Sequence, residues 1–137
     1  MRLAFLIHRL DYSGAPKMLA WVANQMAQRG HDVHVITFFS TEKIQSLHKH
    51  VKLHCFNICQ SKSRFVRNTV EMLTVQYRLL RELKLIEPDV IISFNISATY
   101  IHLGLNKFWG KYKITLNTQK SAFSYFLLHF ICRLFGM

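Results

Sequence analysis

The segment Leu10–Lys17 carries polar residues whose types and spacing could do chemistry. It reads Leu-Asp-Tyr-Ser-Gly-Ala-Pro-Lys and closely follows an apolar run. The Asp11 carboxylate and the Ser13 hydroxyl can hydrogen-bond a ligand, and Gly14 allows close approach to the backbone. Amide groups at the start of a helix attract phosphate or carboxylate groups. The glycine patterns of dinucleotide and nucleoside-triphosphate loops are missing, so neither ligand is predicted here.

Two asparagines extend this candidate site because each ends a predicted strand. Asn95 follows the apolar run Val90–Phe94, and Asn117 closes the segment Lys113–Asn117. Their amides can bond ligand hydroxyl groups, although asparagine also caps loops with no ligand present. His8 ends the first strand and could serve as a general base or only as a structural residue. The candidate substrate-binding residues are Asp11, Ser13, Gly14, Ala15, Asn95 and Asn117. The competing interpretation of Gly14 is a plain strand-to-helix turn.

Apolar runs and helical spacing alternate along the chain in the manner of an α/β domain. Continuous apolar runs predict strands covered on both faces, and apolar residues three and four apart predict helices. The predicted strands are 3–8, 33–39, 51–58, 90–94 and 113–117. The predicted helices are 15–29, 64–84, 97–105 and 121–135. This order predicts an open, mostly parallel Rossmann-like sheet with helices on both faces, which binds ligands at the carboxyl ends of its strands.

Two of these helices have a distinctive apolar surface. In the helix over 64–84 we expect the core-facing residues to be Val66, Val70, Leu73, Tyr77, Leu80 and Leu83. The helix over 121–135 is apolar nearly all round and too short to span a bilayer. It is expected either to pack under other elements or to dock on a membrane or a partner.

Composition and charge bound the class of protein. The 137 residues suffice for one domain, and half of them are hydrophobic. Eighteen Lys and Arg against seven Asp and Glu give a net charge of +11, and the last acidic residue is Asp89. Such a surface attracts phospholipid, nucleic acid or a phosphorylated substrate, or it only keeps the protein soluble. No nucleic-acid-binding motif is present, so no nucleic-acid partner is predicted.

The cysteines and histidines predict neither disulfides nor a metal site. Three cysteines and an N-terminus without signal-peptide character indicate a cytoplasmic protein. The histidines and cysteines between His48 and Cys59 do not have a known metal-ligand spacing, and strand alternation places His54 and Cys55 on opposite faces. No cofactor is expected.

The opening RLAFLIHRLDYSGAPKMLAWVANQMAQRGHDVHVITF resembles that of family 4 glycosyltransferases of the GT-B fold. Those openings run strand, loop, Gly-Gly-Ala-Glu, amphipathic helix, Arg-Gly-His-Glu-Val, strand. The counterparts here are Ser-Gly-Ala-Pro over 13–16 and Arg-Gly-His-Asp-Val over 29–33. The segment Glu87–Asn95 also resembles the family's Pro-Asp-Val-Ile strand. The resemblance covers most of residues 1–120.

The chain departs from the family pattern at several places. Ser13 replaces the first glycine of the pair, and Pro16 replaces the acid. The segment Leu116–Lys120 lacks the acid and the arginine that related enzymes often carry after the fifth strand. Residues 1–137 contain no counterpart of the family's donor-binding C-terminal domain with its Glu-x7-Glu motif. We therefore expect residues 1–137 to be one incomplete N-terminal domain, inactive in isolation.

The resemblance implies the acceptor-side half of a retaining glycosyltransferase. Its partners would be a nucleotide-sugar donor bound mostly by the missing domain, a glycan or lipid-linked acceptor, an anionic membrane surface, and a partner chain that carries the C-terminal domain. It would lie in the cytoplasm or at the inner face of the cytoplasmic membrane. One alternative is an inactive remnant that acts as a basic membrane- or partner-binding module. Another is a Rossmann-like nucleotide-binding protein unrelated to sugar transfer.

Overall fold

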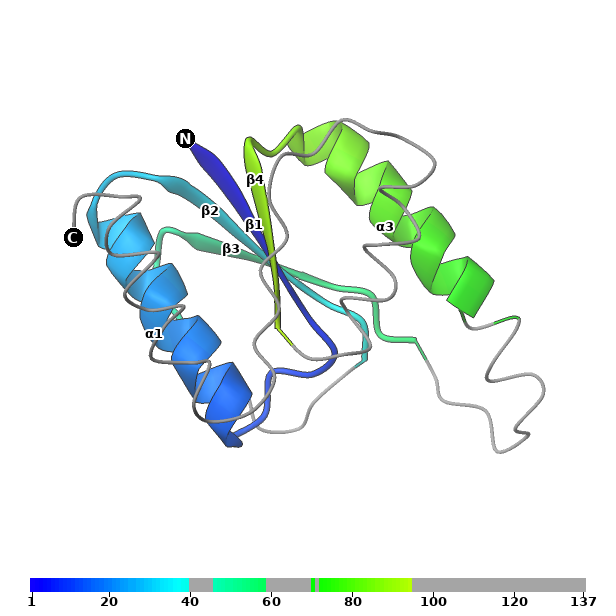
Figure 1. Cartoon of the computed structure of the whole chain (residues 1–137), viewed down its shortest axis with the longest axis horizontal. Coiled ribbons are helices and arrows are strands. Elements are labelled where there is room, and N and C mark those ends of the chain that lie inside the picture. Colours follow the sequence, from blue (N-terminus) through cyan, green and yellow to red (C-terminus); the bar gives the residue numbers. More distant parts are fainter. Residues whose placement is uncertain (40–45, 59–69, 71, 95–137) are drawn as a thin grey trace.

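The computed structural model describes residues 1–39, 46–58, 70 and 72–94. In chain order their elements are β1 (Arg2–Ile7), α1 (Gly14–Gln28), β2 (Asp32–Thr37), β3 (Val51–Cys55), α3 (Met72–Ile86) and β4 (Val90–Phe94). All neighbouring strands are parallel and lie in the order β3-β2-β1-β4. The helices α1 and α3 lie on opposite sides of this sheet (Figure 1). The chain therefore has the α/β, Rossmann-like fold that the sequence predicts.

The strand β1 is inside the sheet, and its burial explains its composition. Every residue of β1 except Arg2 is buried. Leu3 pairs with Val33 of β2 on one side and with Val90 of β4 on the other. A strand flanked by two others and covered by two helices has no solvent-exposed face, so both rows of its side chains must be apolar.

Each helix packs on one row of these side chains. Alternate residues of a strand point to opposite faces, so the odd and even positions of β1 enter different clusters. The cluster under α1 includes Leu3, Phe5, Ile7, Leu19, Val22, Met26, Val33, Val35, Ile92 and Phe94. The cluster under α3 includes Ala4, Leu6, Ile36, Phe38, Val75, Leu79, Leu83, Ile86 and Ile91.

The strand order places a crevice at one edge of the sheet. From β1 the chain proceeds to β2 and β3 on one side, whereas β4 pairs with the other side of β1. The order reverses at β1, and the carboxyl ends of β1 and β4 therefore form a topological switch point. Open α/β sheets bind ligands at such a point. The loop between β1 and α1 begins there.

The helix α1 ends at Gln28, one residue before the predicted end, and Gly30 follows its C-cap residue Arg29. This glycine has φ +83°, a left-handed conformation that suits glycine best. Its N–H donates to the carbonyl of Ala27 at 3.1 Å, and the N–H of His31 donates to that of Met26 at 3.2 Å. These two bonds make a Schellman motif, which satisfies carbonyl groups of the last turn.

The structure corrects the predicted core face of the second long helix. In α3 the buried side chains are Val75, Leu79, Leu83 and Ile86. Of the residues expected to face the core, Leu83 is buried and Leu80 is partly buried. Leu73 and Tyr77 are instead 62% and 71% exposed, and Val70 is also exposed. The apolar residues of this segment follow helical spacing on more than one side, so spacing alone selected the wrong side.

Two polar contacts accompany the observed orientation of α3 about its own axis. Arg78 Nη1 donates to the carbonyl oxygen of Phe56 at 2.6 Å, and Glu82 Oε2 lies 3.4 Å from His54 Nδ1. Both partners belong to β3 or directly follow it. Turning α3 to bury Tyr77 would separate these pairs and leave polar groups beside the core.

The remaining boundaries differ little from the predictions, with two exceptions. The strand β3 ends at Cys55 rather than at Ile58, and α3 continues to Ile86 rather than ending at Lys84. The predicted strand 113–117, the helices 97–105 and 121–135, and residue Val66 lie outside the described residues. Within the described ranges, no helix combines the length and the apolar character needed to cross a bilayer.

Candidate functional site

The loop after β1 is closed by a hydrogen-bonded turn between Asp11 and Ser13. Asp11 Oδ1 accepts the backbone N–H of Ser13 at 2.9 Å and its hydroxyl at 2.5 Å. An aspartate that accepts from the backbone two residues later forms an Asx-turn, which replaces a backbone turn by a side chain. The carboxylate is thereby held at the carboxyl edge of the sheet, immediately before α1.

The same turn leads into the first turn of α1. Ser13 occupies the N-cap position with an extended backbone, and the N–H of Lys17 donates to its carbonyl at 3.2 Å. Its hydroxyl makes no capping bond to the helix, because it turns back to Asp11. Pro16 has no N–H, so the amides of Gly14 and Ala15 are the donors that the first two positions of the helix contribute.

Gly14 has no conformational need to be glycine. It does not have a positive φ, and a Cβ built on it would meet no atom within 4 Å. The fold therefore does not explain this glycine. The open space in front of it agrees with the suggestion that a ligand approaches the backbone here.

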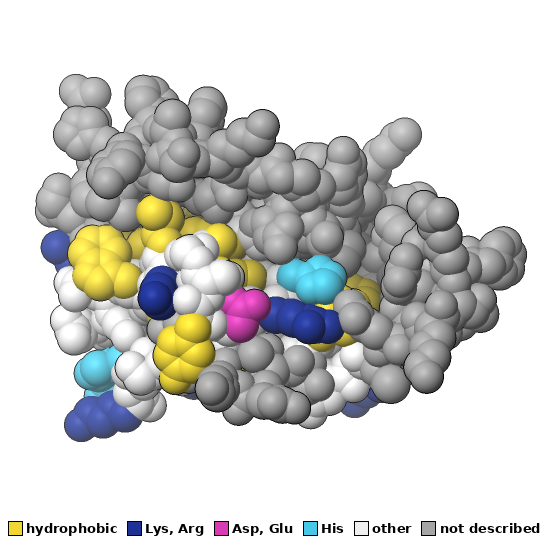
Figure 2. Space-filling view, turned by 90° about the horizontal axis from the view of Figure 1, so that it is seen from below, with side chains coloured by type: hydrophobic (Ala, Val, Ile, Leu, Met, Phe, Trp, Pro, Cys, Tyr) yellow, Lys and Arg dark blue, Asp and Glu magenta, His cyan; other side chains and the backbone are white. Residues whose placement is uncertain are grey.

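A small cavity opens beside this turn. Its volume is about 140 Å³, and its lining residues are Ile7, His8, Arg9, Asp11, Ser13, Ala15 and Pro16. The ring of His8 packs on Phe39, with the centroids 4.3 Å apart, and the Arg9 guanidinium lies 5.7 Å from the same ring. The N–H of Phe39 also donates to the carbonyl of His8 at 3.2 Å, which joins the segments that follow β1 and β2. Figure 2 shows this face, where an acidic side chain lies beside basic and histidine side chains.

The titratable groups of the cavity have distinct charge states at neutral pH. Burial, together with the neighbouring Arg9, lowers the pKa of His8. The Ser13 hydroxyl and then its N–H lower the pKa of Asp11, and Arg9 adds to this effect. The site therefore presents a neutral imidazole and an ionised carboxylate close to an arginine. Such a set can accept hydrogen bonds from ligand hydroxyl groups and accept a proton.

The structure brings together part of the predicted site. Asp11, Ser13 and Ala15 line the cavity, and Gly14 lies between them in the first turn of α1. Asn95 directly follows β4, but Asn95 and Asn117 both lie outside the described residues.

The prediction missed Arg9 and Phe39. The sequence rule that could have found Arg9 is its position just after β1, at the carboxyl edge. Phe39 comes from the segment after β2, and its contact with His8 depends on how the two loops meet.

Metal ligation has no geometric support in the ranges that the structure covers. No group of three His, Cys, Asp or Glu side chains there is placed to hold a metal ion. Cys55 is exposed, and its Sγ lies 2.9 Å from Asn57 Oδ1, whereas His54 contacts His34.

Comparison with known proteins does not assign the site. No family model matches the chain, and no curated protein matches it. Interpretation of the cavity therefore depends on its own residues and on the sequence resemblance.

Proposed function

We propose that this chain supplies the acceptor-side half of a retaining glycosyltransferase, which moves a sugar from a nucleotide sugar to a glycan or lipid-linked acceptor. The observation that carries this proposal is the Asp11 carboxylate, held by Ser13 at the switch point of the sheet. It lies within the segment whose residues resemble the opening of family 4 glycosyltransferases.

The chemistry of the cavity suits the recognition of sugar hydroxyl groups. Both oxygens of an ionised carboxylate are hydrogen-bond acceptors, so Asp11 presents to a ligand the type of group that binds sugar hydroxyls. His8 is neutral at pH 7 because its pKa is lowered, so it can accept a hydrogen bond or a proton from a hydroxyl group. On the other side of the turn, the Gly14 and Ala15 amides and the positive end of α1 favour the diphosphate of a donor.

The resemblance assigns most nucleotide contacts to a second domain. Purified chain should therefore bind acceptor saccharides through the Asp11 turn and bind free nucleotide weakly. Ligand-observed NMR with a panel of saccharides, UDP, and UDP- and GDP-sugars tests this expectation. Asp11→Asn should abolish saturation transfer to the saccharide. Glu87→Gln removes one negative charge at the opposite edge, where the Glu87 carboxylate is 64% exposed, and should leave it intact.

Two results would reject the proposal. Absence of saccharide binding to the folded chain would remove the acceptor-side role. Tight binding of UDP or a UDP-sugar, lost in Asp11→Asn, would place the whole nucleotide site on this domain and favour a nucleotide-binding protein of another kind.

One observation favours the alternative of a membrane- or partner-binding module. The exposed side of α3 carries Leu73, Tyr77 and Leu85, and Arg81 and Lys84 border a shallow hollow beside Tyr77. Apolar side chains flanked by cations suit an anionic lipid surface. Co-sedimentation with vesicles that contain phosphatidylglycerol tests this function. Leu73→Ser combined with Leu85→Ser should reduce binding, whereas Leu53→Ser on β3 should not.

A further inference from the structure

A hydrogen-bonded basic turn precedes β3. The N–H of Val51 donates to the carbonyl of His48 at 2.9 Å, which closes a turn over residues 48–51. The side chain of Asn24, on α1, holds the start of this turn. Asn24 Oδ1 accepts the N–H of His48 at 2.6 Å, and its Nδ2 donates to the carbonyl of Ser46 at 3.2 Å. The side chains of Lys49 and His50 are therefore presented from a backbone that is tied to a helix.

This turn forms one wall of a cavity of about 710 Å³ at the amino edge of the sheet. Its lining residues are Ala27, Gln28, Gly30, His31, Asp32, His48, Lys49, His50 and Lys52. Five of these nine residues are cationic or become cationic on protonation, and one is acidic. The volume falls within the range of small-molecule sites in proteins.

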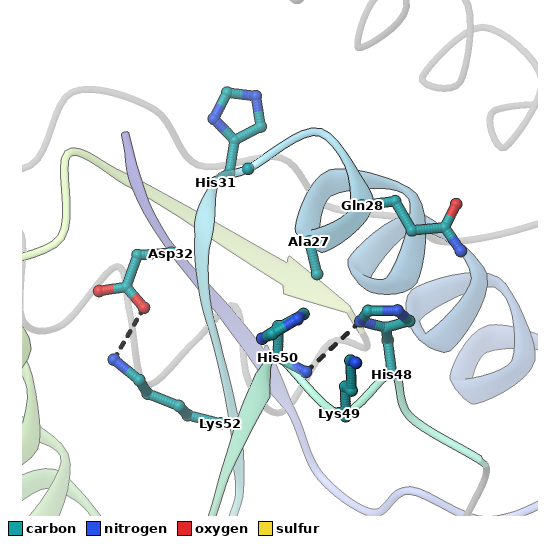
Figure 3. A pocket seen from close by; sticks show the side chains of 9 residues that line it. Ala27, Gln28, His31, Asp32, His48, Lys49, His50 and Lys52 are labelled. Atoms are coloured by element: carbon teal, nitrogen blue, oxygen red, sulfur yellow. Dashed lines mark hydrogen bonds and ion pairs between the residues drawn. The ribbon is translucent and has the colours of Figure 1, made fainter.

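The acid of this cavity is already neutralised. Asp32 Oδ1 accepts from Lys52 Nζ at 2.9 Å and lies 3.3 Å from His34 Nε2. Figure 3 shows the pair Asp32–Lys52 on one side of β2, with His48 and His50 on the other side, near α1. The charge of Lys49 and of the protonated histidines is therefore not cancelled by the carboxylate in the lining.

The basic residues are not needed to cap α1. A helix C-terminus attracts cations when its last carbonyl groups lack donors. Here the carbonyls of Met26 and Ala27 accept from His31 and Gly30, in the Schellman motif. Helix capping thus leaves the gathering of histidines and lysines at this edge unexplained.

We propose that this cavity binds a phosphomonoester group against the basic turn. A phosphomonoester carries nearly two negative charges at pH 7 and has three terminal oxygens, each a strong acceptor. Lys49 supplies a point charge, and the His50 ring and His48 Nε2 supply N–H donors, whereas His48 Nδ1 accepts the backbone N–H of His50 at 3.4 Å. This site lies at the amino edge of the sheet, whereas the glycosyltransferase cleft lies at the carboxyl edge, so the two proposals stand or fall separately.

Affinity should depend on pH because histidine donates from both nitrogens only when it is protonated. The charged groups in this lining are Lys49 in the turn and the pair Asp32–Lys52 on the other side of β2 (Figure 3), and the N-terminal amine and Arg29 act on His31. Burial, then the N-terminal amine and Arg29, lower the pKa of His31. Binding should be tightest near pH 6, where phosphate still carries much of its second charge.

The decisive experiment is an NMR titration of labelled chain with inorganic phosphate, at constant ionic strength maintained with chloride. Ring signals of His48 and His50 and the amide signal of Lys49 should shift saturably at pH 6.0. The affinity should be about tenfold lower at pH 8.0, since a charge-assisted hydrogen bond is lost. Lys49→Gln should weaken binding by about the same factor. Lys17→Gln removes the same charge at the other end of α1 and should not.

A second variant separates a built site from a diffuse basic surface. Asn24→Ala leaves the net charge unchanged but releases the turn from α1. Provided that its amide spectrum shows a folded chain, it should lose most of the affinity for phosphate. Linear shifts without saturation, or equal effects of Lys49→Gln and Lys17→Gln, would overturn the proposal.

The source of the phosphate group can be distinguished in the same system. Glycerol 3-phosphate represents a soluble ligand, and phosphatidylcholine vesicles that contain phosphatidic acid represent a lipid headgroup. Competition by glycerol 3-phosphate with no Lys49-dependent retention on vesicles identifies a soluble ligand. Retention that is lost in Lys49→Gln identifies the headgroup.

Discussion

His34 on β2 and His54 on β3 bring two ring nitrogens, Nδ1 and Nε2, to within 3.0 Å of each other. The rings lie nearly parallel, with centroids 5.2 Å apart. A carboxylate lies at each end of this pair. Asp32 Oδ1 is 3.3 Å from His34 Nε2, and Glu82 Oε2 is 3.4 Å from His54 Nδ1. The two imidazoles therefore join an acid on β2 to an acid on α3.

When both rings are neutral, these three contacts have one hydrogen fewer than they need. Three contacts each require one hydrogen, but two neutral imidazoles carry only two. Whichever tautomers form, one nitrogen faces an acceptor with no hydrogen between them. Among the residues that the structure describes, the buried His34 Nε2 makes no hydrogen bond, although it lies 3.3 Å from Asp32 Oδ1. A further proton on His34 would complete the contacts, but it would charge a buried ring, and burial outweighs the attraction of Asp32, so the pKa of His34 is lowered.

Stability should fall on mild acidification, and His34 should contribute to the loss. Burial lowers the pKa of His34 although Asp32 acts in the opposite direction, and burial also lowers the pKa values of His8 and His31. The unfolded chain then binds more protons than the folded chain as the pH drops below about 6.5. The free energy of unfolding, measured by urea titration, should decrease from pH 7 to pH 5. His34→Gln should show a smaller decrease, and an unchanged pH dependence would contradict this assignment.

The side of α3 that faces the core predicts a large loss of stability for one substitution and a small change for another. Leu79 is fully buried, and Leu79→Ala should cost about 2–5 kcal/mol of unfolding free energy because it leaves a cavity. Tyr77 is mostly exposed, and Tyr77→Ala should change stability by less than about 0.5 kcal/mol. Urea midpoints of the two variants check this. Greater loss in Tyr77→Ala would restore the face that apolar spacing predicts.

The two described glycines offer a matched comparison. Gly30 has φ +83°, so Gly30→Ala should destabilise the chain by about 1 kcal/mol, even though a Cβ meets no atom there. Gly14→Ala should be within about 0.5 kcal/mol of the parent, because neither φ nor space opposes a side chain. Thermal or urea unfolding distinguishes them. A large loss in Gly14→Ala would mean that this glycine serves the fold rather than a ligand.

The sequence predicts an element of the fold correctly where a single physical cause produces its residue pattern. β1, β2 and β4 are apolar because both of their faces are buried, and Gly30 ends α1 because its backbone is left-handed. The core face of α3 was not predictable from spacing, because apolar residues occupy more than one side of the helix. The observed orientation of α3 accompanies contacts with the β3 segment, which is distant in sequence.

Part of the candidate site likewise follows from the sequence pattern, and part of it does not. The position of Asp11 and Ser13 at the carboxyl edge follows from the change of a strand pattern to a helix pattern. The packing of His8 on Phe39 does not, because it joins two loops that follow different strands. Local pattern predicts which loop reaches the edge, and tertiary packing determines which side chains meet there.

The turn between Asp11 and Ser13 allows a test of the site that does not require a ligand. The hydroxyl of Ser13 is the largest cause of the lowered pKa of Asp11, and its N–H is the second. Ser13→Ala removes only the first, so the pKa of Asp11 should rise toward the ordinary value while the backbone bond keeps part of the effect. Ser13→Thr keeps a hydroxyl and should leave the pKa low. The carboxyl ¹³C shift of Asp11, followed from pH 7 to pH 2, measures both.

The sign of the linked stability change follows from the same shift. A carboxyl group with a lowered pKa stabilises the folded chain above its unfolded pKa, and this stabilisation disappears as the pH falls through the folded pKa. Ser13→Ala should therefore lose stability at pH 7 and retain it nearly unchanged near pH 2, where Asp11 is protonated in both variants. Equal losses at the two pH values would show that the hydroxyl supports the turn independently of the charge. In that event the Ser13 hydroxyl would not be the cause of the lowered pKa of Asp11, and the turn would be held without help from the charge.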